Sequence, residues 1–324
     1  MKRVLFDVLE MNIAVAVIIV LVGVLAEILR KRYGAGWMKA IWMLLAVRLL
    51  IPYNFSLPIT ELRFFNSPGF GQEMKTEFSY SDILVGMWVL GMIICALYYL
   101  IAYICLHRQW KSNIRPLQND ELEKRICALQ VKYMGKICVS VYESDSATSP
   151  MLLGLLVPKL VMPTHKERWD EKELEFIIAH EICHYRMKDL WLKMIMLAVS
   201  CVNWFNPAVL YMKNQFFYDC ELVCDDCVIK NDSNADKEIY SKTLISFAKA
   251  EKDELIFMAG LVADKKQIKR RIYYMWENGK LKNGIIVFAM VFVLLLGLGV
   301  SVSCGYKPQE NSQMFESGME NINE

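Results

Sequence analysis

The chain has 324 residues, of which 55% are hydrophobic and 22% are charged, and its mean hydropathy is +0.26. This apolar content excludes a disordered chain and exceeds that of an ordinary soluble enzyme, but it is too low for a channel embedded almost wholly in a bilayer. The formal net charge of +2 gives no global sign of nucleic-acid binding. The composition therefore favours a membrane anchor joined to a polar domain.

Four segments are predicted to cross a membrane. Residues 83–106 and 284–304 contain no formal charge over 24 and 21 residues, and about 20 apolar residues are enough to cross a bilayer core. The segment at about 5–29 is predicted to be an anchor, because acidic residues interrupt its start and no signal-peptide cleavage site follows. The segment at 36–53 contains Lys39, which can lie near a membrane surface, and a surface helix is its alternative.

The charges between these segments predict the orientation of the chain. Basic residues 30–32 follow the first span, and 27 of the 37 Lys and Arg residues lie in 107–283, whereas 54–82 and 305–324 are mainly acidic. Residues 107–283 are therefore predicted to form a cytoplasmic domain. An extracellular loop is expected at 54–82 and a short extracellular tail at 305–324, so that both chain ends lie outside the cell.

Residues 180–184 read H-E-I-C-H, and the ten residues before them predict an amphipathic helix. Positions i and i+4 of a helix share a face, so His180 and His184 can bind one Zn²⁺. Glu181 is turned about 100° from His180, where it can accept a proton from water that the metal activates. The pattern predicts the two histidines as metal ligands and Glu181 as the catalytic base. A surface helix with two histidines is the alternative.

A catalytic zinc site needs a third protein ligand and an open position. The acidic stretch at 218–227 leads us to predict Glu221 as that ligand, with Asp219 as an alternative. Asp225 lies four residues after Glu221 on the same helix face, where it can hydrogen-bond the far nitrogen of a ligand histidine and fix its tautomer. An ordinary polar helix face is the other interpretation of these acids.

Cys220, Cys224 and Cys227 have the spacing that radical S-adenosylmethionine enzymes use for an iron–sulfur cluster. At positions i, i+4 and i+7 they share one helix face, which favours packed thiols, and a cysteine-bound structural zinc is the remaining alternative. Most of the ten cysteines lie in spans or in the cytoplasmic part, where they are expected to stay reduced.

Residues 194–212 contain no charge, and hydropathy alone would predict a further span. A crossing here would place His180 and Glu221 on opposite sides of the membrane. Pro207 and two asparagines also interrupt the stretch with groups that a lipid-facing helix disfavours. We therefore predict a bent, membrane-associated helical hairpin near 190–212, with the active site at the membrane surface.

The stretch at 150–163 is apolar with three prolines and predicts short strands with turns. Metalloproteases often bind substrate as an added strand at such an edge. A purely structural hairpin is the alternative.

A basic cluster precedes the last span, and attraction to anionic lipid is its expected role; it comprises Lys265, Lys266, Lys269, Arg270 and Arg271. Membrane lipid is thus one expected partner, and direct nucleic-acid binding is not expected. Homodimerisation is left open.

Over most of its length the chain resembles the BlaR/MecR-type membrane zinc metallopeptidases. The features that carry the resemblance are Ser149-Pro150 with Gly154 and Pro163, the H-E-I-C-H sequence with Arg186 and Asp189, Trp204-Phe205-Asn206-Pro207, and Cys220-Glu221-Leu222-Val223-Cys224-Asp225. The resemblance implies that Glu181 is the base and that the zinc ligands are His180, His184 and Glu221. Asp189, like Asp225, is expected to support these ligands by hydrogen bonds.

The resemblance implies a mainly α, multi-pass membrane protein. Four transmembrane helices would carry a gluzincin-like α+β zinc metallopeptidase domain, inserted between the third and fourth spans and holding one Zn²⁺ per chain. It also implies a bacterial plasma membrane and an antirepressor function, in which an outside signal activates the protease. The protease then cleaves itself or a cytosolic, DNA-bound repressor.

The chain departs from the β-lactam receptors of this family, which carry a penicillin-binding sensor domain after the last span. About 20 residues follow Cys304, and they contain no Ser-x-x-Lys sequence. Acylation by a β-lactam is therefore not expected, and sensing is expected from the 54–82 loop, the spans or a partner protein. A non-catalytic membrane receptor or scaffold and a housekeeping membrane metalloprotease are the alternative functions.

Overall fold

The computed structural model describes residues 2–51, 80–135, 139–145, 147, 149–164, 169–229, 233–250, 265–277 and 281–303. Most of the predicted loop at 54–82, Cys304 and the predicted tail at 305–324 lie outside these residues. The described part is mostly helical, which confirms the prediction of a mainly α protein.

The helices of the described part, in chain order, are α1 (Lys2–Tyr33), α2 (Ala35–Leu50), α3 (Tyr80–Asn113), α4 (Asp120–Met134), α5 (Glu171–Arg186), α6 (Asp189–Val202), α7 (Pro207–Ile229), α8 (Asn234–Ala250), α9 (Lys265–Glu277) and α10 (Ile285–Ser303). The strands are β1 (Ile114–Pro116), β2 (Ser140–Ser144), β3 (Met151–Leu153) and β4 (Lys159–Pro163). Helices α1, α2, α3 and α10 cover the four segments predicted to cross a membrane. Only Gly34 separates α1 from α2.

The strands form one sheet in the order β1-β2-β4-β3, so that β3 is an edge strand. β2 and β4 are parallel, whereas β3 runs antiparallel to β4 with Leu152 opposite Leu160. The turn between β3 and β4 needs a glycine, because Gly154 has φ +96° and a Cβ there would lie 2.4 Å from the Val157 carbonyl oxygen.

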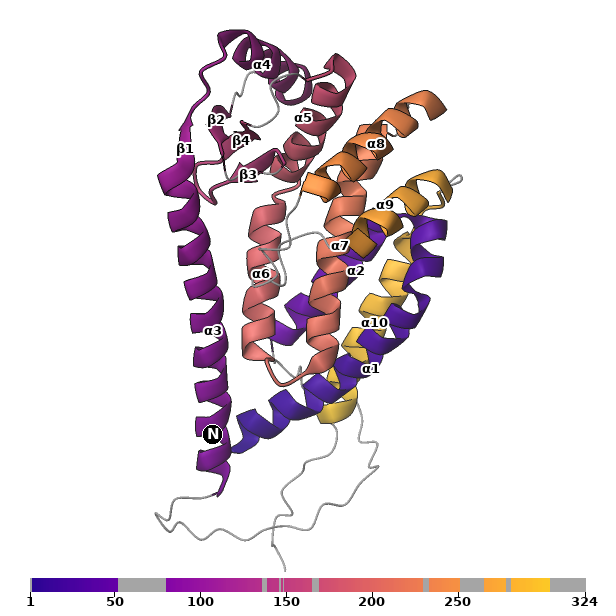
Figure 1. The fold of residues 1–324 in the computed structure, drawn as a ribbon. Coiled ribbons are helices and arrows are strands. Elements are labelled where there is room, and N and C mark those ends of the chain that lie inside the picture. The colour runs from indigo at the N-terminus through magenta and orange to yellow at the C-terminus, as the bar shows by residue number, and fades with distance from the viewer. Residues whose placement is uncertain are drawn as a thin grey trace, which may run out of the picture.

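The two largest hydrophobic cores of the described residues lie in different parts of the molecule. The sheet, α4 and α5 enclose a core around Ile126, Leu160 and Ile178, while a second core fills the helical bundle around Trp42 and Phe216. Figure 1 shows the sheet, α4 and α5 at one end, with α1, α2, α3, α6, α7 and α10 running lengthwise beside or below them. Helix α7 extends from the bundle to α5 and therefore joins the two parts.

A buried ion pair holds α7 in the bundle. Arg30 Nε on α1 donates to Asp219 Oδ1 over 2.6 Å, and Trp42 Nε1 on α2 donates to Asp219 Oδ2 over 2.8 Å. Asp219 has no exposed surface and Arg30 is 3% exposed. Because removing one partner of a buried pair leaves an uncompensated charge, this contact ties α1 and α2 to one register of α7.

Helices α6 and α7 form a hairpin whose turn is made by residues 203–206. Asn206 Nδ2 donates to Asn12 Oδ1 on α1 over 3.1 Å, and Trp88 Nε1 on α3 donates to the Val202 carbonyl over 2.9 Å. The turn therefore packs against both α1 and α3. Whether the hairpin enters a membrane stays a prediction.

Two helices are long and apolar enough to cross a membrane by length and composition, at Leu9–Tyr33 and Asp82–Cys105. The apolar stretch Ile285–Gly297 in α10 is shorter. Helix α3 exposes most of its large apolar side chains between Ile83 and Ile104, whereas the inner face of α1 is buried in the bundle. The structure supports membrane-crossing helices, while four spans and their orientation stay predictions.

We predict that purified Gly91→Ala melts at a lower temperature than Gly86→Ala, because a Cβ at residue 91 would lie 2.2 Å from the Trp204 ring. The clash would disturb the hydrogen bond that Trp204 Nε1 donates to the Trp88 carbonyl, and an overpacked contact costs about 1 kcal/mol or more. Gly86→Ala on the same helix is the matched control, since its Cβ meets nothing within 4 Å. Equal melting temperatures for the two variants would contradict this packing.

Candidate metal centre

Helix α5 is built so that one face packs in the core and another faces α7. Asp170 caps the helix by accepting a hydrogen bond from the Lys172 backbone N–H. Leu174, Ile178 and Ile182 recur every four residues and pack in the core around the sheet. This packing sets the rotation of the helix and leaves His180 and His184 on the side that faces α7.

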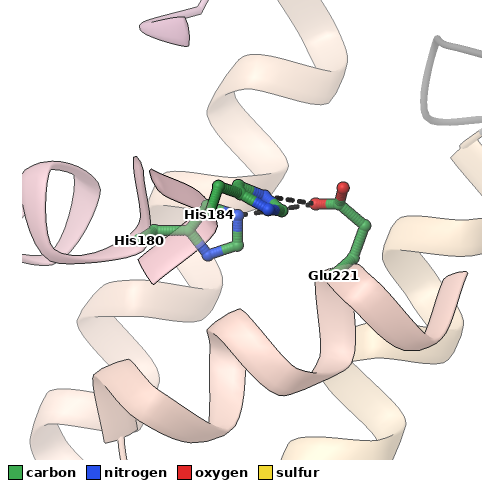
Figure 2. A group of neighbouring side chains, drawn as sticks. All are labelled: His180, His184 and Glu221. Carbon is green, nitrogen blue, oxygen red and sulfur yellow. Dashed lines mark ion pairs between the residues drawn. The ribbon is translucent and has the colours of Figure 1, made fainter. Parts of the chain in front are cut away.

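The structure brings His180, His184 and Glu221 together between α5 and α7. Figure 2 shows both imidazole rings directed toward the Glu221 carboxylate, which comes from the neighbouring helix. The Nε2 atoms of His180 and His184 lie 3.4 and 3.5 Å from Glu221 Oε2. The three potential ligand atoms all lie within 4.8 Å of one another.

These separations fit a zinc ion. Tetrahedral zinc lies about 2.0–2.1 Å from nitrogen and oxygen ligands, which places neighbouring ligand atoms ~3.4 Å apart. The two histidine–glutamate distances have this length. The set of two nitrogens and one oxygen also leaves the fourth position open, as a catalytic zinc site requires.

The other nitrogen of each histidine has a partner that fixes the ring. His184 Nδ1 lies 2.7 Å from Asp189 Oδ2. His180 Nδ1 lies 2.9 Å from the Tyr240 hydroxyl, which donates to Asp225 Oδ1 over 2.7 Å. With Nδ1 engaged, each ring presents Nε2 to the metal position. Asp189 and Asp225 are therefore placed where the sequence predicted support, while Tyr240 was not predicted.

Glu181 lies at the junction of α5 and the sheet. Its Oε2 accepts a hydrogen bond from the Leu152 backbone N–H on edge strand β3 over 3.0 Å. Burial raises the pKa of Glu181, and the two nearby histidines offset this only in part. A carboxylate with a raised pKa is suited to accept and return a proton near neutral pH.

Glu221 is surrounded by positive charge. Lys193 Nζ on α6 lies 3.2 Å from Glu221 Oε1, the oxygen that does not face the histidines. Burial alone would raise the pKa of Glu221, but Lys193 and His184 outweigh it and lower the pKa well below its usual range. Glu221 is thus held in its anionic form. Lys193 was not predicted, although it is the last charge before the uncharged stretch at 194–212.

The pKa of His184 is shifted in the opposite direction. Burial would lower its pKa, but Glu221 and Asp189 raise it to about 10 in the metal-free protein. A histidine must lose its proton to bind a metal, so metal binding here has to release a proton.

The alternative ligand Asp219 and two other residues of these segments make different contacts. The alternative ligand Asp219 is paired with Arg30 in the bundle, and Tyr218 packs between the guanidinium groups of Arg30 and Arg270. Arg186 is exposed near the end of α5.

The cysteines of the iron–sulfur-like spacing pack behind the site. Cys220 and Cys224 are buried and Cys227 is exposed. Cys224 Sγ lies 3.3 Å from His184 Nδ1, and His184, Asp189 and Cys224 form a second group close enough to hold a metal. Because Nδ1 of His184 is already hydrogen-bonded to Asp189, we assign this group to support of the first.

The structure corrects the interpretation of Arg271 as a lipid-attracting residue. Arg271 is 5% exposed, and its Nε and Nη2 atoms donate to Asp225 over 2.8 and 2.7 Å. The sequence did not distinguish Arg271 from the rest of the basic cluster, because the other members are also Lys and Arg. Lys39, predicted near a membrane surface, is also buried and pairs with Asp189.

The site lies within a segment that known proteins share. The family described as "BlaR1 peptidase M56" matches residues 70–275. The chain is 27% identical to the methicillin resistance mecR1 protein of Staphylococcus aureus over 202 residues, which is 61% of this chain and 34% of that protein. It is 26% identical to the regulatory protein BlaR1 of Bacillus licheniformis over 234 residues, which is 69% of this chain and 38% of that protein. The chain thus spans little more than a third of the length of these relatives.

We predict that Glu221→Ala abolishes tight zinc binding, because it removes one of the three predicted ligands. The affinity should fall by more than the roughly 10–100-fold that loss of a supporting residue causes. Glu238→Ala on α8 is the control, since this glutamate is exposed and pairs only with Lys242 on the same helix in the described part. Zinc titration against a chelator measures the effect, and full retention by Glu221→Ala would exclude it as a ligand.

We predict that Glu181→Gln stabilises the protein in chelator. A carboxyl whose pKa is raised on folding favours the folded state while protonated, and this advantage is lost as pH rises through the folded-state pKa. The amide can still accept the Leu152 hydrogen bond but carries no charge. The melting temperature should rise by roughly 2–4 °C at pH 8, which corresponds to about 1 kcal/mol in a domain of about 200 residues. The difference from wild type should shrink toward pH 4, and a constant difference would contradict the role of ionisation.

Proposed function

Because the chain belongs to the BlaR1 peptidase M56 family, we propose that it is a membrane-embedded zinc endopeptidase that transduces a signal by cleaving a protein. The proposed ligands are His180, His184 and Glu221, and the proposed base is Glu181. The observation that carries the proposal is the pair of distances, 3.4 and 3.5 Å, from the histidine Nε2 atoms to Glu221 Oε2. These are the separations that neighbouring ligand atoms of a tetrahedral zinc ion have.

The residues around the site have separate chemical tasks. A zinc ion bound there supplies a Lewis acid that polarises a carbonyl and makes water more acidic. Glu181 takes a proton from the attacking water and returns it to the leaving amide nitrogen. Asp189, Tyr240 and Asp225 keep both histidines in the tautomer that presents Nε2.

The sheet offers a place for the substrate. β3 is an edge strand, and its Leu152 N–H contacts the base Glu181. A peptide added beside β3 would use backbone hydrogen bonds and would pass the base. An extended segment of a protein is therefore the proposed form of the substrate.

The proposed setting is a bacterial plasma membrane. Helices α1, α2, α3 and α10 are proposed as four spans, and the α6–α7 hairpin as a membrane-associated element. The catalytic part then lies in the cytoplasm with both chain ends outside, as the charge distribution favours. The remaining exposed basic residues of α9 are proposed to contact anionic lipid.

The proposed substrate is this chain itself or a cytosolic repressor that binds DNA. The names of the relatives, a methicillin resistance protein and a regulatory protein, favour regulation over general protein turnover. A housekeeping protease would share the same zinc chemistry but would accept unrelated substrates. A non-catalytic receptor would keep the fold without needing both the ligands and the base.

We predict that Glu181→Gln lowers the cleavage rate by about 10²–10⁴-fold, the usual contribution of a general base. Purified protein with zinc and a candidate repressor provides the assay, with self-cleavage followed in the same gel. The variant should still bind one zinc, because Glu181 is not a proposed ligand. Glu171→Gln, on the exposed first turn of α5, should cleave at the wild-type rate.

The outcomes separate the three functions. Unchanged cleavage by Glu181→Gln would show that the proposed mechanism is wrong. Zinc binding without cleavage of any tested protein would favour the receptor. Cleavage of unfolded membrane proteins, but of no repressor, would favour the housekeeping protease.

A further inference from the structure

The carboxylates that support the zinc histidines are themselves deeply buried. Asp189 is 1% exposed and Asp225 is fully buried. A buried carboxylate that stays ionised needs a positive partner, because water no longer stabilises its charge. The partners of these two acids therefore determine whether the acids can hold the histidines.

The partner of Asp225 comes from α9. Arg271 binds both oxygens of Asp225 in a bidentate pair, and its third nitrogen, Nη1, lies 3.4 Å from Glu221 Oε2. One guanidinium thus contacts the acid behind His180 and also the oxygen that faces both histidines. The planar fork of arginine suits this double role, which a lysine cannot reproduce.

The partner of Asp189 comes from α2. Lys39 Nζ contacts Asp189 Oδ1, while Asp189 Oδ2 contacts His184 Nδ1. The lysine side chain is 11% exposed. It reaches the acid from a helix that packs mainly on α1 and α7 inside the bundle.

Resting on the proposed zinc site, we propose that Lys39 and Arg271 are positioning residues for the two zinc histidines. Each cation fixes the carboxylate that orients one ring, His184 through Asp189 and His180 through Asp225 and Tyr240. Both cations lie outside the metallopeptidase motif, on α2 and on the helix that precedes α10. Zinc affinity consequently depends on how these two helices sit against α5 and α7.

The test compares the zinc affinity of the full chain in lipid nanodiscs, measured by competition with a chelator. Lys39→Met and Arg271→Met should each weaken zinc binding by about 10–100-fold, as loss of other supporting residues does. Lys31→Met and Arg270→Met are the matched controls. Lys31 pairs with Glu277 and Arg270 pairs with Glu27, and both ion pairs are exposed. The controls should bind zinc as the wild type does.

A second measurement separates positioning from general destabilisation. If Lys39 acts through Asp189, Lys39→Met should cause little further loss of affinity in an Asp189→Asn background. Arg271→Lys should recover only part of the affinity, since it keeps the charge and loses the fork. Co²⁺ is the spectroscopic probe, and Lys39→Met and Arg271→Met should alter its visible bands even when enough metal is added to fill the site.

The results also distinguish this inference from the function on which it rests. If His180→Ala binds zinc as tightly as the wild type, the proposed zinc site is wrong and the inference falls with it. If zinc binding needs His180 but tolerates Lys39→Met and Arg271→Met, with unchanged Co²⁺ bands, only the positioning role is overturned. Additive losses in the Asp189→Asn background would likewise overturn the role of Lys39. If Lys39→Met does not fold, the double variant Lys39→Met with Asp189→Asn is compared with Asp189→Asn alone. If Arg271→Met does not fold, Arg271→Met with Asp225→Asn is compared with Asp225→Asn alone.

Discussion

The approach of α5 to α7 is the constraint on which the rest of the structure depends. Two of the proposed zinc ligands come from α5 and the third from α7, and a zinc ion tolerates ligand distances only within a few tenths of an ångström. The contact is close because the residue between the helices is small: Cys224 Sγ lies 3.3 Å from His184 Nδ1. A larger side chain at this position would separate the helices and the ligands together. The small size of Cys224 therefore explains a buried cysteine at this position without an iron–sulfur cluster.

The parts of the site that could be predicted are those that follow from spacing on a helix. His180 with His184, and Glu221 with Asp225, are four residues apart, so each pair shares a helix face whatever the rest of the chain does. Tyr240, Lys193 and Arg271 could not be found this way. They reach the predicted ligands from other helices, and only the packing of α6, α8 and α9 brings them there. Lys39 could be singled out from the sequence, because a charge inside an apolar segment is costly unless it is paired.

Hydropathy predicted where the helices of the bundle lie in the sequence better than it predicted which of them are exposed and which are buried. The apolar stretch of α3 between Ile83 and Ile104 exposes most of its large side chains, whereas α2, with Lys39, is buried on one face among other helices. The uncharged stretch at 194–212 becomes two helices with a turn at 203–206. The family resemblance is confirmed by the match over residues 70–275. Average hydropathy does not distinguish a lipid-facing helix from one that packs on protein, and the pattern of buried charges does.

The continuity of α7 has a mechanical consequence. Its first turn follows the Asn206 contact with α1, and Glu221 lies 15 residues further on, which corresponds to roughly 22 Å along an unbroken helix. A hydrogen-bonded helix is stiff along its axis, so it transmits a displacement along its length instead of absorbing it. A displacement of the hairpin turn by the neighbouring α1 or α3 would be transmitted along α7 to Glu221 almost undiminished. Glu221 is the proposed third ligand, so α7 links the hairpin turn directly to the proposed metal site.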